Sequence, residues 1–429
     1  MHPLPPYTPS MYTIDLLPSG LPVLTAPASG VESVTVMVFA GAGSRYEKNE
    51  ERGISHFLEH MFFKGGKKYK NTKEVSATLE GVGGDFNAFT GKEYAGYYVK
   101  AAATHTDLAC DVLSDMLLHA TFPQEEIEKE RGVILEEEHM YQDTPMYRAG
   151  WDFEQLLYGD HPLGWDTIGT EAVINSVNQV DFLRHKEALY TAKNTVIAFS
   201  GNITREKALM LAEKYFGTLK GDKDHAFPAF TTFGKDKVLL RTKKTEQSHL
   251  VIGVPGVGAL DKDHFPIKLL SIILGGNMSS RMFLNIREAK GLCYYISSEI
   301  DSYMDAGSLS TRAGIDQSRL HEAISLIIHE YDAIAKDAVT DEEMVRAKEY
   351  LKGRITLSME DTEERAHFYG KQQLLYPEVR DLPEYFTKID GVTKAQVNAL
   401  AKRLLTHEQL RLVVIGQEES QSKLEELIK

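Results

Sequence analysis

The sequence predicts an α+β fold with two homologous domains, each a mostly antiparallel sheet with helices packed on one face. The chain has 429 residues, more than one ordinary domain holds. Its two halves repeat one order of strands and helices with a period of roughly 200 residues. The stretch between the halves is polar and turn-rich, so we expect domains at 1–218 and 237–429 joined by a linker at 219–236.

The first half opens with alternating apolar and polar residues, which indicate strands. We expect a hairpin within 11–27 that turns at Pro18–Gly20, then a strand within 31–43 and a polar loop. Either Asn71 or Thr72 is a suitable N-cap for the helix that we expect at 73–80. Further along, the pattern predicts helices at 53–63 and 73–80, a hairpin within 81–102 turning near Gly91, helices at 106–119, 124–145 and 146–157, a strand at 194–202 and a helix at 204–215.

The second half repeats this order. A strand and a polar loop within 249–264 precede an apolar helix, 266–275, which stands where helix 53–63 stood but carries no metal-ligand residues. A hairpin at 294–315, helices at 318–334 and 341–359, and a last strand at 410–416 complete the repeat. We therefore expect one half to carry chemistry that the other lacks.

Composition narrows the function classes. The formal net charge of −14 argues against nucleic acid or an anionic membrane surface as the main partner, because both attract basic patches. Cys110 and Cys293 are expected to be buried, reduced thiols. The N-terminus lacks the features of a signal peptide, and no stretch reaches the roughly 18 apolar residues of a membrane span. We expect a cytoplasmic protein of bacterial origin, with a processed precursor as the alternative.

The short motif HFLEH places His56, Glu59 and His60 on one face of the helix at 53–63. Two histidines four residues apart lie about 40° from each other around a helix, so both can bind one Zn²⁺ ion. Glu59 shares that face and is placed to act on a water rather than on the metal. This H-x-x-E-H order is typical of the inverzincins. The alternative is a solvated helix face with an i,i+4 contact.

A catalytic zinc ion needs a third protein ligand. The helix at 124–145 carries ERGVILEE, in which Glu130 and Glu137 are seven residues apart and point the same way. The many glutamates of this helix also fit a solvated acidic face. Glu136 and His139 form the E-x-x-H unit of di-iron proteins, but a second unit is missing because position 53 is glycine.

The combination of motifs resembles the pitrilysin family of metallopeptidases, which includes the insulin-degrading enzymes and the mitochondrial processing peptidases. The resemblance rests on HFLEHMFFKG, on ERGVILEE, on GGDFNAFT followed by KEYAGYY, and on LGGNMSSRMFLNIREAKGLCYYISS in the second half. It covers nearly the whole chain. It implies a zinc metalloendopeptidase with one Zn²⁺ per chain, although the ligands would also accept Mn²⁺ or Co²⁺.

The resemblance also assigns roles. His56, His60 and Glu137 are the implied zinc ligands, and Glu59 is the implied general base that activates the zinc-bound water. Glu130 would orient a ligand histidine. Two further pairs are implied to bind substrate: Asn87 and Ala88 on an edge strand, by strand addition, and Arg287 and Tyr294. Tyr294 would also donate to the developing oxyanion. Without the resemblance, Arg287 and Tyr294 read as a surface salt bridge and a core-edge tyrosine.

Long members of this family carry four such domains in one chain, and this chain has two. The resemblance therefore implies a homodimer, a clamshell in which each zinc site is completed by Arg287 and Tyr294 of the other copy. The substrates would be peptides or unfolded polypeptide segments admitted to the enclosed chamber. Three alternatives stay open: a heterodimer with a related subunit, a non-catalytic or partner-dependent subunit like those of the processing peptidases, and a metal-binding storage or sensing protein.

Overall fold

The computed structural model describes residues 11–418 and 420–429. The strands of the first sheet are β1 (Thr13–Leu16), β2 (Pro22–Pro27), β3 (Ser33–Ala40), β4 (Asp85–Thr90), β5 (Ala95–Ala102) and β6 (Thr195–Gly201). Those of the second sheet are β7 (Val238–Thr242), β8 (Gln247–Pro255), β9 (Cys293–Ser302), β10 (Gly307–Asp316) and β11 (Arg411–Gly416).

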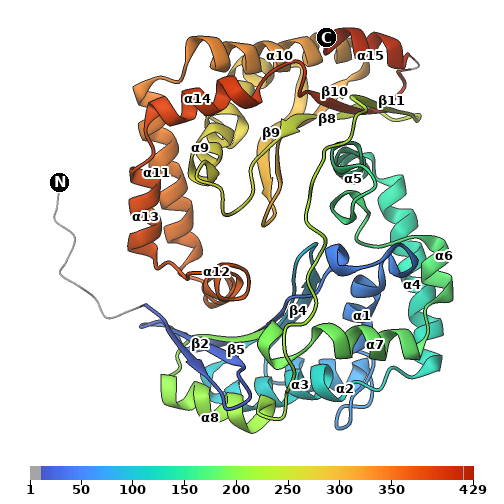
Figure 1. Cartoon of the computed structure of the whole chain (residues 1–429), viewed down its shortest axis with the longest axis vertical. Helices are drawn as coiled ribbons and strands as arrows, with labels where there is room; N and C mark the ends of the chain where they lie inside the picture. Colours follow the sequence, from blue (N-terminus) through green and yellow to red (C-terminus); the bar gives the residue numbers. More distant parts are fainter. Residues whose placement is uncertain (1–10, 419) are drawn as a thin grey trace. The chain divides into compact units, whose positions relative to one another are not determined.

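Helices fill most of the remaining chain (Figure 1). The first half has α1 (Ile54–Phe62), α2 (Thr72–Glu80), α3 (Thr106–His119), α4 (Gln124–Asp143), α5 (Pro145–Tyr158), α6 (Glu171–Ser176), α7 (Gln179–Leu189) and α8 (Arg205–Phe216). The second half has α9 (His264–Gly275), the π-helical segment η6 (Phe283–Glu288), α10 (Leu320–Asp337), α11 (Asp341–Ser358), α12 (Thr362–Leu375), α13 (Leu382–Asp390), α14 (Lys394–Leu404) and α15 (Gln421–Leu427).

Both sheets are mostly antiparallel, and their strand orders correspond. The first sheet has the order β1-β2-β6-β3-β5-β4 and the second β7-β11-β8-β10-β9. Each contains one parallel pair, β2 with β6 and β7 with β11, and the other neighbours are antiparallel. The predicted α+β class with two repeated sheets is confirmed. The edge strands β4 and β9 occupy equivalent places.

The first sheet is covered by helices on both faces, so the prediction that helices pack on one face only is wrong for this sheet. On β5, the ring of Tyr97 lies 5.3 Å from that of Phe62 in α1, centroid to centroid. The next residue, Tyr98, packs in a cluster with Ala366 and Tyr369 of α12. Because successive strand residues point to opposite faces, α1 and α12 lie on opposite faces of this sheet. Figure 1 shows α12, in the orange of the C-terminal third, beside the strands of the first sheet.

The chain forms two compact units, and two helices do not follow the sequence halves. Unit 1 contains the described residues up to Glu136 together with Asp166–Pro228 and Thr356–Tyr385, and unit 2 contains Glu137–Trp165, Ala229–Ile355 and Phe386–Lys429. Thus α12 belongs to unit 1, while α5 packs on the second sheet through Phe153 and Leu157, next to Val251 and Val413. An amphipathic pattern does not reveal which sheet a helix covers. The predicted domain limits, 1–218 and 237–429 with a linker at 219–236, stay a prediction.

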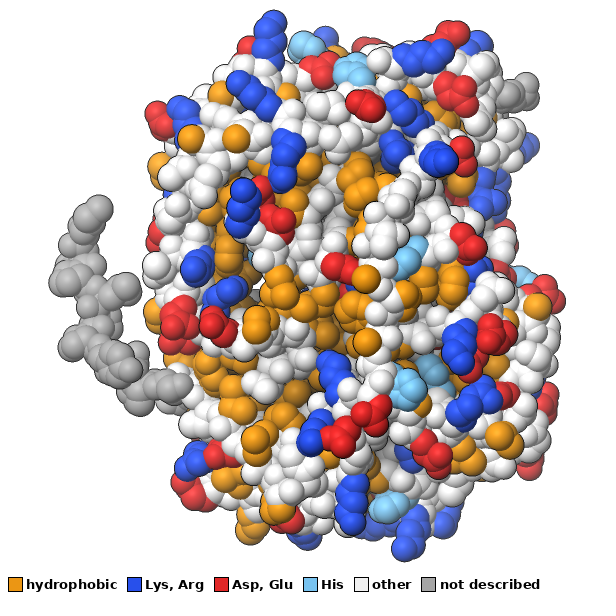
Figure 2. All heavy atoms as spheres, in the orientation of Figure 1, with side chains coloured by type: hydrophobic (Ala, Val, Ile, Leu, Met, Phe, Trp, Pro, Cys, Tyr) orange, Lys and Arg blue, Asp and Glu red, His pale blue; other side chains and the backbone are white. Residues whose placement is uncertain are grey.

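Most predicted elements are present within a few residues of their expected bounds. Residues 219–237 form neither helix nor strand. The predicted elements include no counterpart of strand β7, of the π-helical segment η6, or of helices α6, α7, α12, α13, α14 and α15. Within the described part of the chain, no helix is both long and apolar enough to cross a membrane. Over the face drawn in Figure 2, basic and acidic side chains are interspersed, unlike the basic stripe with which proteins bind nucleic acid.

Candidate metal centre

Helix α1 is fixed at its N-terminus by a buried carboxylate. The Glu47 side chain accepts hydrogen bonds from the backbone N–H groups of Gly53 (2.7 Å) and Ser55 (2.8 Å). These are among the donors that a helix leaves unpaired at its start. Gly53 has φ +93°, and a Cβ there would lie 2.3 Å from the Ile168 carbonyl oxygen, so only glycine fits. The entry into the helix is therefore tightly specified.

One group among the described residues could hold a metal ion, and it is formed by His56, His60 and Glu137. Their ligand atoms lie within 4.8 Å of one another. The two histidine rings, on α1, are 4.7 Å apart between centroids, and Glu137 comes from α4. Two imidazoles and one carboxylate form a donor set that catalytic zinc sites use, with a fourth position left for water. The residues therefore fit a zinc ion.

The protonation of the histidines suits metal binding. Burial, and then the neighbouring charge of His60, lowers the pKa of His56 to about 3, so its ring is neutral near pH 7. The Nδ1 atom of His60 donates to Oε1 of Glu130 at 2.8 Å, which leaves its Nε2 atom for a metal. Burial raises the pKa of Glu130, but the bonds from His60 and Lys64 outweigh this and bring it below its ordinary value. Glu130 is thus an ionised acceptor.

Glu59 lies on α1 beside the two histidines but outside the ligand group. Its Oε2 atom accepts a hydrogen bond from the Thr90 hydroxyl at 2.6 Å. The buried Tyr97 and Tyr190, whose hydroxyls are 2.7 Å apart, are near enough for the Glu59 charge to raise the pKa of both, after the larger effect of burial. A carboxylate that lies beside a group of metal ligands but outside it has the placement of a base rather than of a ligand.

The remaining predicted residues lie on strand edges and in the π-helical segment. Asn87 and Ala88 are on β4, the last strand of the first sheet, and the Asn87 side chain is exposed. Tyr294, near the start of the edge strand β9 in unit 2, is 77% exposed. The Arg287 guanidinium lies 4.6 Å from the centroid of the Phe283 ring within η6. Segments of π-helix occur frequently at functional sites. The roles of these residues stay predictions.

Several residues that shape this site were missed by the sequence analysis. Glu47 and Thr90 bond directly to α1, and Arg45 forms a fully buried ion pair with Glu93 at 2.6 Å. His185 on α7 contacts the hydroxyl of Ser55 at 3.1 Å, and burial lowers the pKa of His185 to about 4. Thr90 and Glu93 lie in motifs that the sequence analysis used, GGDFNAFT and KEYAGYY, whereas Glu47 is too far before Gly53 for a capping pattern to reveal it.

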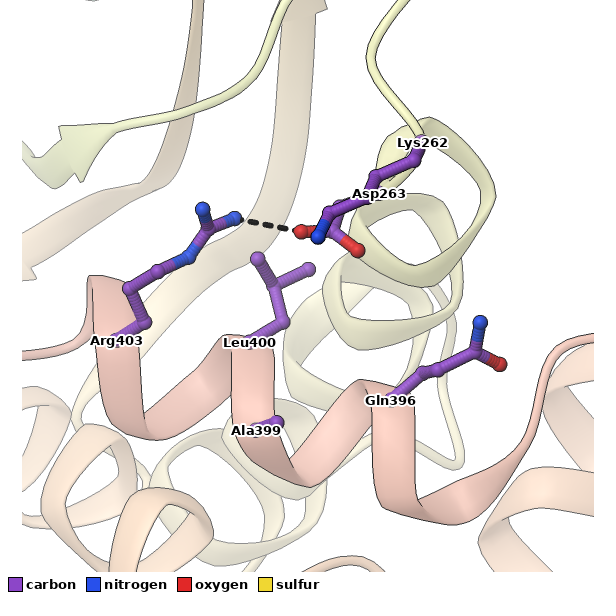
Figure 3. A pocket seen from close by; sticks show the side chains of 6 residues that line it. All are labelled: Lys262, Asp263, Gln396, Ala399, Leu400 and Arg403. Carbon is purple, nitrogen blue, oxygen red and sulfur yellow. Dashed lines mark hydrogen bonds and ion pairs between the residues drawn. The ribbon is translucent and has the colours of Figure 1, made fainter.

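A separate pocket in unit 2 lies between the start of α9 and α14 (Figure 3). Asp263 and Arg403 form an ion pair at 2.7 Å across it. Its other lining residues are Lys262, Gln396, Ala399 and Leu400. This set offers no group of metal ligands, and its only lysine, Lys262, is exposed, so we assign no site to it.

Comparisons with known proteins agree with the motifs. Residues 23–170 match the family model "Insulinase (Peptidase family M16)", and residues 176–351 match "Peptidase M16 inactive domain". The zinc protease YmxG of Bacillus subtilis is 36% identical, over 88% of this chain and 92% of that protein. A zinc protease of Streptomyces coelicolor is 33% identical, over 91% of this chain and 86% of that protein. Both relatives bear the word "uncharacterized" in their names.

Solved structures share the fold. A protease from Helicobacter pylori has a TM-score of 0.87 at 22% identity, with 96% of this chain and 100% of that chain covered. A peptidase M16 inactive domain from Pseudomonas fluorescens has a TM-score of 0.88 at 20% identity, with 96% of this chain and 99% of that chain covered. From the two family models and the curated zinc proteases, the chain belongs to the insulinase, or pitrilysin-like, family of zinc proteases, peptidase family M16.

Proposed function

We propose that this protein is a zinc-dependent endopeptidase that hydrolyses peptides or unfolded polypeptide segments. The observation that carries the proposal is the group of His56, His60 and Glu137, whose ligand atoms lie within 4.8 Å, with the carboxylate of Glu59 on the same helix. These are the parts that metal-assisted peptide hydrolysis requires. Membership of a zinc protease family supports the same reaction class.

The three ligands would come from two helices, the histidines from α1 and Glu137 from α4. When bound, zinc supplies a Lewis acid that makes a water molecule acidic enough to serve as a nucleophile near neutral pH. Glu130 supports the site by fixing the tautomer and orientation of the His60 ring. The Glu130 carboxylate also forms an ion pair with Lys64, so two side chains, His60 and Lys64, hold it in place.

Glu59 would act as the general base. Its carboxylate would accept a proton from the attacking water and pass it to the leaving amine. Tyr294 would donate a hydrogen bond to the substrate carbonyl as it becomes an oxyanion, and Arg287 would bind the substrate. Extended substrate would add to the outer edge of β4 at Asn87 and Ala88. The Ala88 N–H, which donates to Oδ1 of Asn87 at 2.9 Å, would exchange that partner for the substrate backbone. Strand addition favours unfolded segments, because a folded chain has already paired these groups.

We further propose that two copies assemble into a homodimer that encloses a chamber, with Arg287 and Tyr294 of each copy serving the zinc site of the other. Complementation tests this. Glu59→Gln and Tyr294→Phe chains, each inactive alone, should regain activity when mixed and allowed to exchange subunits. The mixed dimer has one site with both Glu59 and Tyr294. Continued inactivity of dimers proven to be mixed, or a monomer in native mass measurement, would contradict the arrangement.

The second candidate is a non-catalytic or partner-dependent subunit. The family model matched by residues 176–351 describes an inactive domain, which suits a half without metal ligands. A subunit of this kind would bind zinc, yet cut nothing without a second, different chain.

The deciding experiment is cleavage of a quenched fluorogenic peptide library by the purified wild type and by Glu59→Gln, with zinc measured on both. Peptidase function predicts cleavage by the wild type only, with about one zinc per chain in both proteins, as a single three-ligand site requires. Cleavage by both the wild type and Glu59→Gln would show that Glu59 is not the general base. Zinc binding without cleavage by the wild type would favour the partner-dependent subunit.

A further inference from the structure

We propose that Thr90 is the positioning residue for the catalytic carboxylate: its hydroxyl holds one oxygen of Glu59 so that the other faces the water and peptide. This inference rests on the proposed peptidase function and assigns a role that the motifs do not contain.

The contact between the two residues is specific. The Thr90 hydroxyl donates to Oε2 of Glu59 at 2.6 Å, across two elements that are 31 residues apart in sequence. A hydroxyl has a single proton, so Thr90 commits its only donor to this carboxylate. Bonds of this length between a hydroxyl and a carboxylate are charge-assisted and stronger than neutral ones. One Glu59 oxygen is therefore fixed in direction.

The position of Thr90 is itself fixed by buried backbone hydrogen bonds and a buried ion pair. Thr90 is the last residue of β4, and the turn after it is held by backbone bonds from Ser44 to Gly91 (3.2 Å) and from Arg45 to Lys92 (2.8 Å). The buried Arg45 side chain adds the ion pair with Glu93 in the same turn. Space is tight as well, since a Cβ at position 43 would lie 2.4 Å from the Gly91 carbonyl oxygen.

The same segment holds the other partner. Glu47, two residues after Arg45, caps the N-terminus of α1 through Gly53 and Ser55. Residues 44–47 thus fix both the end of β4 that carries Thr90 and the helix that carries Glu59. One buried stretch of backbone therefore sets the distance between the Thr90 and Glu59 side chains.

The contact also answers a chemical problem of the motif. Glu59 directly precedes His60 in the ligand group, and a freely turning carboxylate at that place would compete for the metal. A base that binds the metal cannot accept the proton. By holding Oε2 away, Thr90 separates the base from the ligands and orients its remaining oxygen.

The test compares the wild type with Thr90→Val, which keeps the shape but loses the hydroxyl, and with Thr90→Ser, which keeps the hydroxyl. Thr78→Val is the matched control, because Thr78 donates only to the Glu74 carbonyl on α2. On one fluorogenic peptide, Thr90→Val should lower kcat about ten- to a hundredfold, the range that misplacement of a catalytic group causes. KM and zinc per chain should stay as in the wild type, Thr90→Ser should recover most of kcat, and Thr78→Val should be unaffected.

A second readout does not need catalysis. In metal-free protein, the Tm changes of Glu59→Leu, which removes the acceptor, and Thr90→Val, which removes the donor, should be non-additive, since both remove one contact. Additive changes, a wild-type kcat in Thr90→Val, loss of zinc in that variant, or no recovery in Thr90→Ser would each overturn the positioning role while leaving the peptidase function intact. Absence of cleavage by the wild type is a different result, which would overturn the proposed function and this role with it.

Discussion

The side chain of Glu47, which caps α1, makes the stability of the protein depend on pH. Glu47 is 4% exposed, and burial raises its pKa from 4.5 to about 7 despite the bonds from Gly53 and Ser55. Between these values the folded protein keeps a proton that the unfolded chain releases. Stability therefore falls as pH rises through this window. Each pH unit contributes about 1.4 kcal/mol, so this group should remove about 3 kcal/mol of unfolding free energy between about pH 5 and pH 8.

The variant Glu47→Gln removes the titration and isolates the effect. Urea unfolding of metal-free protein, followed by circular dichroism from about pH 5 to about pH 8, gives the stability of both proteins without metal linkage. The unfolding free energy of the wild type minus that of the variant should decrease by about 3 kcal/mol over that pH range. Glu50→Gln is the control, because Glu50 is an exposed glutamate of the same loop. A difference that stays flat or rises with pH would refute the reasoning.

Three further predictions concern local contacts and backbone strain. Ala338 ends α10 at φ 70°, ψ 169°, so Ala338→Gly should stabilise the protein by about 1–2 kcal/mol and raise Tm; a lower Tm would contradict the strain. Arg45→Met removes the cation that pairs with the buried Glu93 carboxylate, so it should lower the free energy of unfolding in urea by about 3–5 kcal/mol. Arg45→Met combined with Glu93→Gln should lower it less, and equal losses would show that the ion pair is not the cause. Glu130→Gln should weaken zinc binding about 10- to 100-fold in competition with a chromogenic chelator, and unchanged affinity would remove its supporting role.

The helical spacing predicted the histidine pair but left the third ligand open. Positions 56, 59 and 60 share a face in any helix, so their grouping needs no tertiary information. The spacing of Glu130 and Glu137 predicts that they point the same way, and both lie at the site, yet it does not say which binds the metal. That choice depends on how α4 packs, which the resemblance supplied and the helical pattern could not.

The contacts that hold the Glu59 carboxylate lay beyond the sequence patterns. Thr90 meets Glu59 because a sheet edge and a helix are packed together, and neither residue carries a signal of the other. The buried pair of Arg45 and Glu93 reads as two surface charges in sequence, since such residues are rarely buried unless paired. The exchange of α5 and α12 between the units escaped prediction for the same reason: local pattern gives the apolar face, not its partner.

The central claim is that His56, His60 and Glu137 form a zinc centre, and zinc titration of chelator-stripped protein tests it most directly. The wild type should bind about one zinc per chain, and Glu137→Gln should bind it at least about a hundredfold more weakly, because one of three ligands is lost. Glu136→Gln, which alters the exposed neighbour on the same helix, should bind zinc like the wild type. Equal affinity of Glu137→Gln and the wild type, or no zinc bound by the wild type, would contradict the account.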